Sequence, residues 1–484
     1  MPARHTDHVT TSTATPSRLD ARALLTRYVP RGAILLSVLT FGSYVMGLIR
    51  DRILTRTYGI EDGQLDVFNA AFQIPELLFS VVVASGLAAP FIPIFTNLER
   101  DGGEAPAYRF AQTILTLAVA AMLVVAVVLF ALAPWTVEVV APGFDPEARA
   151  LYVELFRLST VSQVLFAGSM ALGEVLIVRR RFVFYGLAPL LYNAGIVIGV
   201  VLLSGRIGIQ AAAVGAILGA SLHVGIRLIG VLTRTTYRPR LRLELRTAAL
   251  GEFFRLMLPK TISSPLDPII FLFFTSVASS LAAGSITTVG LARNFQSVPI
   301  SLIGTAFSLA AFPALAAAYA ARDRRGLVRQ VGSTGASIGV LTVLAAIGLV
   351  IVGPFAIDVL LGGGRFDAEA VARTAAVLAV FAIAIPFESL GHLLSRAIYA
   401  THHTLFQVVA SLIGFVVTVA ATLALVDRIG VLAIPAAYGL GMIVRFAGLT
   451  VVLAWRLRRM PEGPVAPDLA VSPPPPGSAA SAPP

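Results

Sequence analysis

The sequence is dominated by a succession of long apolar runs, about twelve in number, separated by short polar breaks that carry Gly and Pro. A helix needs roughly 20 mostly apolar residues to cross a bilayer, and the runs supply them. Because the runs are continuously apolar and lack a period of two, a membrane β-barrel is disfavoured. We therefore predict an all-α, polytopic membrane protein. The predicted helices span 33–49, 68–95, 109–133, 151–178, 183–203, 207–232, 250–282, 286–318, 333–353, 371–399, 405–426 and 430–455.

Composition and charge support this class. Hydrophobic residues make up 57% of the chain and charged residues only 13%, outside the range of soluble domains. All of the 37 basic residues except Lys260 are Arg, and most lie in the terminal segments and in alternate connections. This bias predicts that both termini are cytoplasmic. The net charge of +11 is then a topology signal that also favours anionic membrane lipids, and no nucleic-acid partner is expected.

The chain contains an internal duplication. Three pairs of similar segments recur at a spacing of 222 to 224 residues, which predicts two six-helix lobes in parallel orientation around a site at the membrane midplane. The pairs are AFQIP (71–75) with NFQSVP (294–299), the turns 179–184 and 401–406, and RIGIQAAAVG (206–215) with RIGVLAIPAA (428–437). The predicted organisation is a cytoplasmic basic tail (1–32), an N-terminal lobe (33–233), a cytoplasmic linker (234–249), a C-terminal lobe (250–456) and a disordered Pro-rich tail (457–484).

The stretch from Arg50 to Pro93 places charge between apolar runs. Arg52 and Arg56 are four residues apart and share one helix face, whereas Arg50 points elsewhere. One interpretation is an interfacial belt in which the arginines reach lipid phosphates. The other is a water-filled vestibule, which is favoured because arginines in an outer segment contradict the charge bias.

An acidic residue and a proline stand within the second predicted helix. Asp66 is placed to cap the N-terminus of this helix. Glu76 lies inside the apolar run, where a carboxylate costs a few kcal/mol unless it is paired or faces water. Pro75 is expected to bend the helix and free backbone carbonyls. We therefore expect Pro75 and Glu76 to act at a hinge or gate.

The seventh predicted helix reads FFRLMLPKTISSPLDPIIFLFF. Pro259 and Pro265 predict a hinge or broken helix, with Lys260 in the weakened region as a candidate for substrate binding. The alternative is an amphipathic lead-in to a helix that begins near Ile269. In the next helix, Arg293 precedes polar residues and should face a polar interior.

Other motifs are absent or carry a structural interpretation. Glu174, Glu388 and Arg445 are buried candidates for helix-to-helix pairs. The adjacent His402 and His403 have no convergent third ligand, and the chain has no cysteine, so no metal site and no disulfide are expected. Phosphate-binding loops and hydrolase motifs are also missing, which argues against a nucleotide cofactor and against an enzyme.

The charged stretch resembles the signature of the MurJ/MviN family, the lipid II flippases of the multidrug/oligosaccharidyl-lipid/polysaccharide exporter superfamily. The similar segments cover about residues 34–455 and read GLIRDRILTRTYG, LDVFNAAFQIPELLFS, AAPFIPIF, APGFD, RRFVFYGLAPLLYNAGIVIG, ARNFQSVPISLIGTAFSLAAFPAL and LLSRAIYATHHT. The resemblance implies transport of a polyprenyl-pyrophosphate-linked precursor across the bacterial inner membrane. It carries over Arg50, Asp66 and Arg293 as functional positions, and guanidinium is a preferred partner of pyrophosphate.

The sequence also departs from the family pattern. Two family arginines are replaced by Tyr44 and Phe79, and a family Asn is replaced by Glu76. After residue 455 the chain lacks the extra helix pair that forms a lipid-tail groove in fourteen-helix members. The apolar part of 405–426 has no Asn or acidic residue, which argues against a sodium site of the kind described in some members. Either Arg52, Arg56 or Lys260 replaces the lost charge, or the cargo differs.

These observations predict an alternating-access flippase for lipid II, driven by the membrane potential or protons. One alternative is an exporter of another lipid-linked oligosaccharide or a small-molecule antiporter. An alternative of another class is a non-transporting membrane scaffold whose tails recruit cell-wall synthesis or division proteins. The scaffold leaves the charge inside the membrane unexplained.

Overall fold

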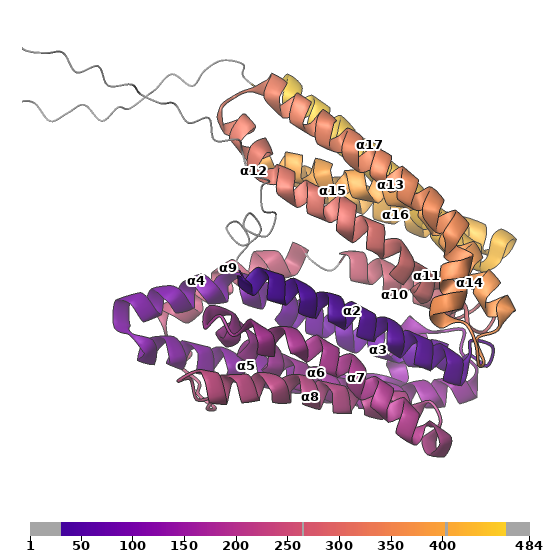
Figure 1. Ribbon diagram of the computed structural model, residues 1–484, viewed down its shortest axis with the longest axis horizontal. Helices are drawn as coiled ribbons and strands as arrows, with labels where there is room; N and C mark the ends of the chain where they lie inside the picture. Colours follow the sequence, from indigo (N-terminus) through magenta and orange to yellow (C-terminus); the bar gives the residue numbers. More distant parts are fainter. Residues whose placement is uncertain (1–30, 264–265, 402–404, 461–484) are drawn as a thin grey trace, which may run out of the picture.

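The computed structural model describes residues 31–263, 266–401 and 405–460, and these residues form helices joined by short turns (Figure 1). The predicted all-α class is confirmed. The elements are α2 (Arg31–Tyr58), α3 (Gln64–Phe79), the π-helix η1 (Ser80–Ala84), α4 (Ser85–Gly102), α5 (Glu104–Val140), α6 (Pro146–Val178), α7 (Phe182–Ile207), α8 (Gln210–Arg234), α9 (Ala248–Ser263), α10 (Leu266–Ala278), α11 (Ser285–Pro299), the π-helix η2 (Ile300–Thr305), α12 (Ala306–Ala320), α13 (Arg324–Leu361), α14 (Ala368–Ala382), α15 (Ala384–Ala400), α16 (Leu405–Ile429), the 3-10 turn η3 (Gly430–Leu432) and α17 (Ala433–Arg458).

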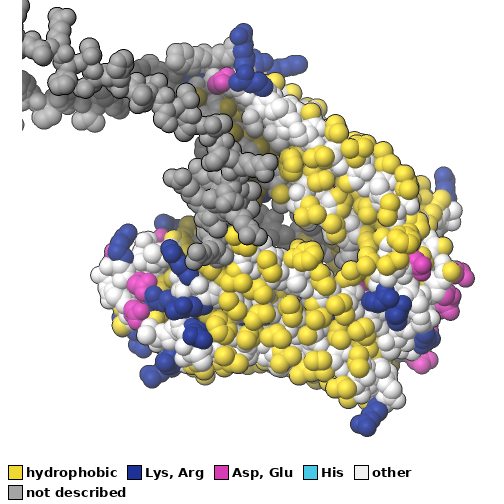
Figure 2. Space-filling view, viewed as in Figure 1, with side chains coloured by type: hydrophobic (Ala, Val, Ile, Leu, Met, Phe, Trp, Pro, Cys, Tyr) yellow, Lys and Arg dark blue, Asp and Glu magenta, His cyan; other side chains and the backbone are white. Residues whose placement is uncertain are grey.

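The helices account for about twelve membrane crossings. Within the described residues, nine helical runs are long and apolar enough to cross a membrane, and ten if the α14–α15 pair, bent by 41°, is one span. The run Leu405–Arg458 is 54 residues long, which at 1.5 Å per residue is about twice a bilayer or more, and its halves α16 and α17 pack side by side. It therefore supplies two crossings, and α9 with α10 supplies another. Figure 2 shows the expected apolar band on the visible face of both lobes, with charged side chains gathered toward the ends.

Two groups of helices form two lobes (Figure 1). Helices α2 to α8 pack together, and α11 to α17 form the second group. The lobes meet at the end where α2 finishes and α11 begins, and they diverge toward the other end (Figure 1). We call the end where the lobes meet the sealed end. We call the other the tail end, because Arg31 and Met460, the limits of the described chain, lie there.

The two lobes repeat one another in detail. The π-helices η1 and η2 occupy corresponding places in the second helical segment of each lobe. Asp145 and Asp367, 222 residues apart, each cap the next helix, accepting hydrogen bonds from the amides of Ala148 (2.8 Å) and Ala370 (2.9 Å). These equivalences support the parallel repeat at positions that the sequence comparison did not use. The helix containing Pro75 stays helical at the proline and becomes π-helical five residues later, a feature frequent at functional sites.

The predicted helix boundaries are mostly too narrow. Helix α5 extends the predicted span 109–133 at both ends, and α13 does the same for 333–353. Each helix begins in polar residues before the apolar run and continues past an internal proline, Pro134 or Pro354, after it. The predicted seventh helix consists of α9 and α10 on either side of Pro265, which lies outside the described residues. Helix α9 packs against α4, whereas α10 contacts α3, α5, α11 and α16. The domain limits at 234–249 stay a prediction.

Helices α7 and α8 pack most closely. Gly195 and Gly199 on α7 face Gly215 and Gly219 on α8, two small-xxx-small pairs in contact. A Cβ at Gly195 would lie 2.2 Å from the Cα of Gly219, and a Cβ at Gly219 would lie 2.2 Å from the carbonyl oxygen of Tyr192. This contact requires glycine because both obstacles are backbone atoms.

Replacing Gly219 with alanine is therefore expected to destabilise the N-terminal lobe. The added methyl group forces α7 and α8 apart, and overpacking of this kind costs about 1–3 kcal/mol. Thermal unfolding of the purified protein in detergent measures the loss. The matched control is Gly225→Ala on the same helix, where a Cβ meets nothing within 4 Å. Equal melting temperatures for the two variants would contradict the prediction.

Candidate functional site

The two lobes are joined at the sealed end by four turns and the ends of the neighbouring helices. The turn between α5 and α6 contacts the turn between α10 and α11, where the amide of Gly143 donates to Ser279 Oγ (3.2 Å). The turn between α13 and α14 contacts the end of α2, where the amide of Arg365 donates to the carbonyl of Arg56 (3.0 Å). Arg365 also pairs with Asp62 at 2.8 Å. We call these contacts, with those of Arg52, Arg56 and Asp66 below, the interlobe seal.

Arg52 and Arg56 belong to the seal. Their spacing puts them on one helix face, as the sequence indicates, and both side chains reach the C-terminus of α13. Arg52 Nη1 donates to the carbonyl of Val359, and Arg56 donates to the carbonyl of Gly362 from Nε (2.7 Å) and Nη2 (2.5 Å). The last carbonyls of a helix lack partners and carry partial negative charge, so guanidinium groups stabilise them. These contacts replace the lipid belt that one interpretation of the sequence offered.

Asp66 also crosses between the lobes. Its buried carboxylate accepts hydrogen bonds from the Thr287 amide (2.7 Å), the Thr287 hydroxyl (2.6 Å) and the Ile286 amide (3.3 Å). The prediction that Asp66 caps its own helix was wrong, because the N-cap of α3 is Gly63 and makes no side-chain cap. Asp66 instead caps α11 of the other lobe. A carboxylate at a helix N-terminus satisfies free amides and interacts favourably with the helix dipole.

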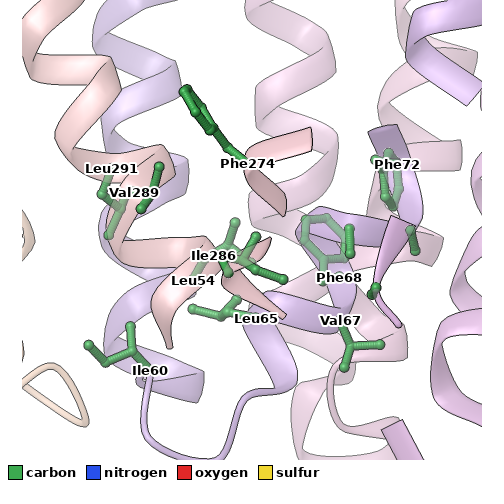
Figure 3. Close-up of a cluster of buried hydrophobic side chains, with 14 of the residues drawn as sticks. Leu54, Ile60, Leu65, Val67, Phe68, Phe72, Phe274, Ile286, Val289 and Leu291 are labelled. Atoms are coloured by element: carbon green, nitrogen blue, oxygen red, sulfur yellow. The ribbon is translucent and has the colours of Figure 1, made fainter. Parts of the chain in front are cut away.

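An apolar layer backs these polar contacts (Figure 3). Leu54 from α2, Leu65 from α3 and Ile286 from α11 point toward one another, and all three are less than 10% exposed. Ile60, from the turn after α2, lies beside Gly284. Because the layer combines both lobes, separating them at this end exposes apolar surface and breaks the polar contacts together.

A cavity of about 370 Å³ lies between the lobes at this level, within the range of small-ligand sites. Its polar lining comes from four helices of both lobes. The polar lining residues are Arg50, Asp51, Thr55, Asn69, Gln73, Glu76, Thr275, Thr287 and Asn294.

Arg50 lines this cavity and is held by neighbours on its own lobe. Its Nη1 donates to Asn193 Oδ1 (2.9 Å), and its Nη2 pairs with Asp51 Oδ1 (2.7 Å). Glu76 is close enough to interact with it electrostatically. Across the cavity, Asn294 Nδ2 donates to Asp51 Oδ2 (3.3 Å). A single guanidinium is thus fixed among polar groups between the lobes.

Arg293 lies apart from this cavity in a partly buried ion pair. Its Nη1 and Nη2 reach both carboxylate oxygens of Glu388 at 3.1 and 3.0 Å, and Nη1 also contacts Gln296. The guanidinium carbon stands 5.1 Å from the ring centre of Phe271 and 5.0 Å from that of Tyr438. The prediction that Glu388 takes part in a helix-to-helix pair is confirmed, and Arg293 is its partner.

This pair makes a separate prediction. Arg293→Met alone is expected to lower the free energy of unfolding by about 1–3 kcal/mol, because it removes the cationic partner of a mostly buried carboxylate and leaves it with hydrogen bonds such as that from Gln296. The double variant Arg293→Met, Glu388→Gln should recover most of this stability. Thermal unfolding measures both. A single variant as stable as the double would contradict the structural role, and lost transport by the stable double would assign Arg293 a further role in the transport cycle.

The structure brings only some predicted site residues together. Arg50 and Glu76 line the cavity, Asp66 borders it, and Arg52 and Arg56 lie in the seal. Pro75 is buried in α3. The side chains of Pro259 and Lys260, and all of Pro265, lie outside the described residues, so their roles stay predictions. Among described residues, no group of three His, Cys, Asp or Glu is placed to hold a metal ion.

Sequence reasoning missed Asn69 and Gln73. Asn69 Nδ2 donates to Thr287 Oγ1 (3.1 Å), and Gln73 Nε2 donates to Thr275 Oγ1. The signal was present, because Asp66, Asn69, Gln73 and Glu76 follow spacings of three and four residues and form a polar stripe along an apolar helix. The stripe faces the other lobe.

A family model described as "Lipid II flippase MurJ" matches residues 62–470. The chain belongs to the MurJ family. A Rickettsia prowazekii relative, "Probable lipid II flippase MurJ", is 25% identical over 428 residues, covering 86% of this chain and 83% of the relative. A Burkholderia cenocepacia relative, "Lipid II flippase MurJ", is 25% identical over 378 residues, covering 76% of this chain and 73% of the relative.

Solved structures show the same fold as this MurJ family member. A structure described as "Lipid II flippase MurJ, inward closed conformation" superposes with a TM-score of 0.73 at 19% identity, covering 87% of each chain. An inward-facing MATE family transporter of the MOP superfamily also has a TM-score of 0.73, at 14% identity, covering 88% of this chain and 98% of that one. The resemblance stated from sequence is confirmed, and the chain is a transporter, not an enzyme.

Proposed function

We infer that this protein is a flippase that carries lipid II, a polyprenyl-pyrophosphate-linked peptidoglycan precursor, from the inner to the outer leaflet. The chain acts in the bacterial cytoplasmic membrane with both termini cytoplasmic, so the sealed end faces outward. The observation that carries the inference is the polar cavity between the lobes, in which Arg50 is fixed directly behind the interlobe seal. Guanidinium binds pyrophosphate through charge-assisted, bidentate hydrogen bonds.

The described conformation is the one that accepts cargo from the cytoplasm. The pyrophosphate would reach Arg50 from the tail end, while the larger sugar and peptide occupy the space between the diverging lobes. Release outward requires Asp66 to leave the α11 N-terminus and Arg56 to leave the α13 C-terminus. The membrane potential can bias this change, because one charge crossing 100 mV gains about 2.3 kcal/mol.

A strain depleted of its own lipid II flippase tests the function. Expression of this chain is expected to restore growth and cell shape, and vesicles containing the purified protein should expose fluorescent lipid II to a reagent added outside. If expression does not restore growth and the vesicles are inactive, lipid II is not the cargo. Proteins of cell-wall synthesis or division are proposed partners, and co-purification from the rescued strain tests them.

A small-molecule antiporter is the second candidate, favoured by one observation. Two carboxylates, Asp51 and Glu76, share the cavity lining with Arg50, so the formal charge of these three groups is negative. A cationic solute suits this balance better than a pyrophosphate. Resistance to cationic dyes without growth rescue would support the antiporter instead of the flippase.

A further inference from the structure

The segment between α8 and α9, residues 235–247, is irregular chain that hydrogen-bonds along the N-terminal part of α5. Gln112 Nε2 donates to the carbonyl of Arg238 (2.8 Å), and the amide of Arg242 donates to Thr116 Oγ1 (2.9 Å). Tyr237 is fully buried and anchors the segment against Tyr108. The connection is therefore docked against α5 in a fixed orientation.

The sequence from residue 240 to 246 alternates charged residues with leucine, RLRLELR. The amides of Arg242 and Glu244, two residues apart, both donate to hydroxyls of α5, as in locally extended chain, where successive side chains point to opposite sides. One row holds Arg242 and Glu244, which pair at 2.6 Å, and Glu244 also reaches Arg109 of α5 at 3.9 Å. The other row holds Leu241, Leu243 and Leu245, which are 84%, 54% and 56% exposed.

The position of the leucine row across the membrane follows from its height along α5. From Thr116, beside the segment, to the exposed Trp135 the helix rises about 30 Å at 1.5 Å per residue, the thickness of a hydrocarbon core. Exposed Trp marks a membrane interface, so the segment lies at the opposite interface. The helix face that carries Thr113 and Thr116 continues to the exposed Leu123, Val124 and Val127, so the segment borders the lipid-facing side of α5.

We propose that residues 238–246 dock onto the lipid leaflet and bind anionic phospholipid. Leu241, Leu243 and Leu245 enter the boundary between headgroups and acyl chains. Arg238, Arg240 and Arg246 belong to the other row, but they are exposed, and their long side chains reach around the segment to the phosphates. The charge supports this occupant, because the segment carries four arginines and one glutamate, and arginines beside a membrane helix attract anionic headgroups. A protein partner would have to reach leucines that lie at lipid depth. The orientation proposed above makes this the cytoplasmic leaflet.

The absence of cysteine from the chain allows a direct test. Leu243→Cys is labelled with an environment-sensitive fluorophore in the full-length protein, reconstituted in phosphatidylcholine vesicles with or without phosphatidylglycerol. We expect blue-shifted emission and at least twofold stronger quenching by acyl-chain nitroxide lipid than for the Arg242→Cys control in the opposite row. Phosphatidylglycerol should increase this quenching, and Arg240→Gln with Arg246→Gln should remove the increase.

Three results would overturn the proposal. If aqueous iodide quenches the probe at position 243 as strongly as the probe at position 242, the leucines lie in water. Shielding from both quenchers that grows with protein density assigns the surface to a second copy of the chain. Equal lipid quenching with and without phosphatidylglycerol would show that the segment does not bind anionic phospholipid. None of these results bears on whether the protein flips lipid II, which the rescue experiment decides separately.

Discussion

Replacing Asp66 with alanine is expected to open the sealed end and abolish growth rescue. The carboxylate accepts three hydrogen bonds from Ile286 and Thr287 across the lobes. Removing it leaves the α11 N-terminus without its cap, and hydrogen bonds to a charged group contribute about 1.5–3 kcal/mol. A net loss of about 3 kcal/mol changes the ratio of sealed to open molecules by roughly a hundredfold.

The opening can be measured with one introduced cysteine. Gly290 lines the cavity, and a Cβ there meets nothing within 4 Å, so Gly290→Cys fits without disturbance. A membrane-impermeant maleimide added outside should label it slowly in the parent chain and much faster with Asp66→Ala. Asp367→Ala is the matched control, because Asp367 caps α14 within one lobe. Equal labelling in both variants would show that Asp66 does not hold the lobes together.

Much of the fold follows from local features of the sequence. The crossings are predictable because a bilayer requires long apolar helices, and the two lobes are predictable because the repeat preserves turn chemistry. The aligned turns APGFD and GGRFD show the second point, since Asp145 and Asp367 cap their helices alike. Boundaries were missed where polar ends extend α5 and α13, because hydropathy marks only the apolar part of a helix.

The interlobe seal was not predictable for a physical reason. Arg52 and Arg56 bind backbone carbonyls about 306 positions away, and a carbonyl acceptor leaves no mark in the sequence. Asp66 has the sequence context of a cap, but the capped helix belongs to the other lobe. The sequence indicates which residue types take part and which helix face they share. The groups they bind in the other lobe depend on how the lobes pack together.

Arg293 illustrates a different limit. An arginine among polar residues in a membrane helix indicates a polar environment, which is correct, but it does not distinguish a substrate ligand from half of a partly buried ion pair. Glu388 lies 95 residues away, and the packing of α15 against η2, which directly follows α11, brings the two together. The cavity therefore holds fewer cationic groups than the sequence comparison expects.

The strongest effect on transport is expected from Arg50→Ala. This change removes the arginine of the cavity lining and leaves Asp51 and Glu76 without a counter-charge, so the cavity repels pyrophosphate. Growth rescue should be lost, and lipid II flipping in vesicles should fall at least a hundredfold. Arg50→Lys should retain part of the activity, because it keeps the charge but loses the planar, bidentate donor.

The double variant Arg50→Ala, Glu76→Gln separates two roles for this arginine. If Arg50 holds the pyrophosphate, removing the nearby carboxylate lowers the repulsion but supplies no donor, and flipping stays at the level of Arg50→Ala. If Arg50 only balances Glu76, the double variant regains transport, and the pyrophosphate contact is wrong. Thermal unfolding of each variant controls for loss of the Arg50–Asn193 bond, which ties α2 to α7. Glu76→Gln alone should flip at least as fast as the parent, because it raises the positive potential at Arg50.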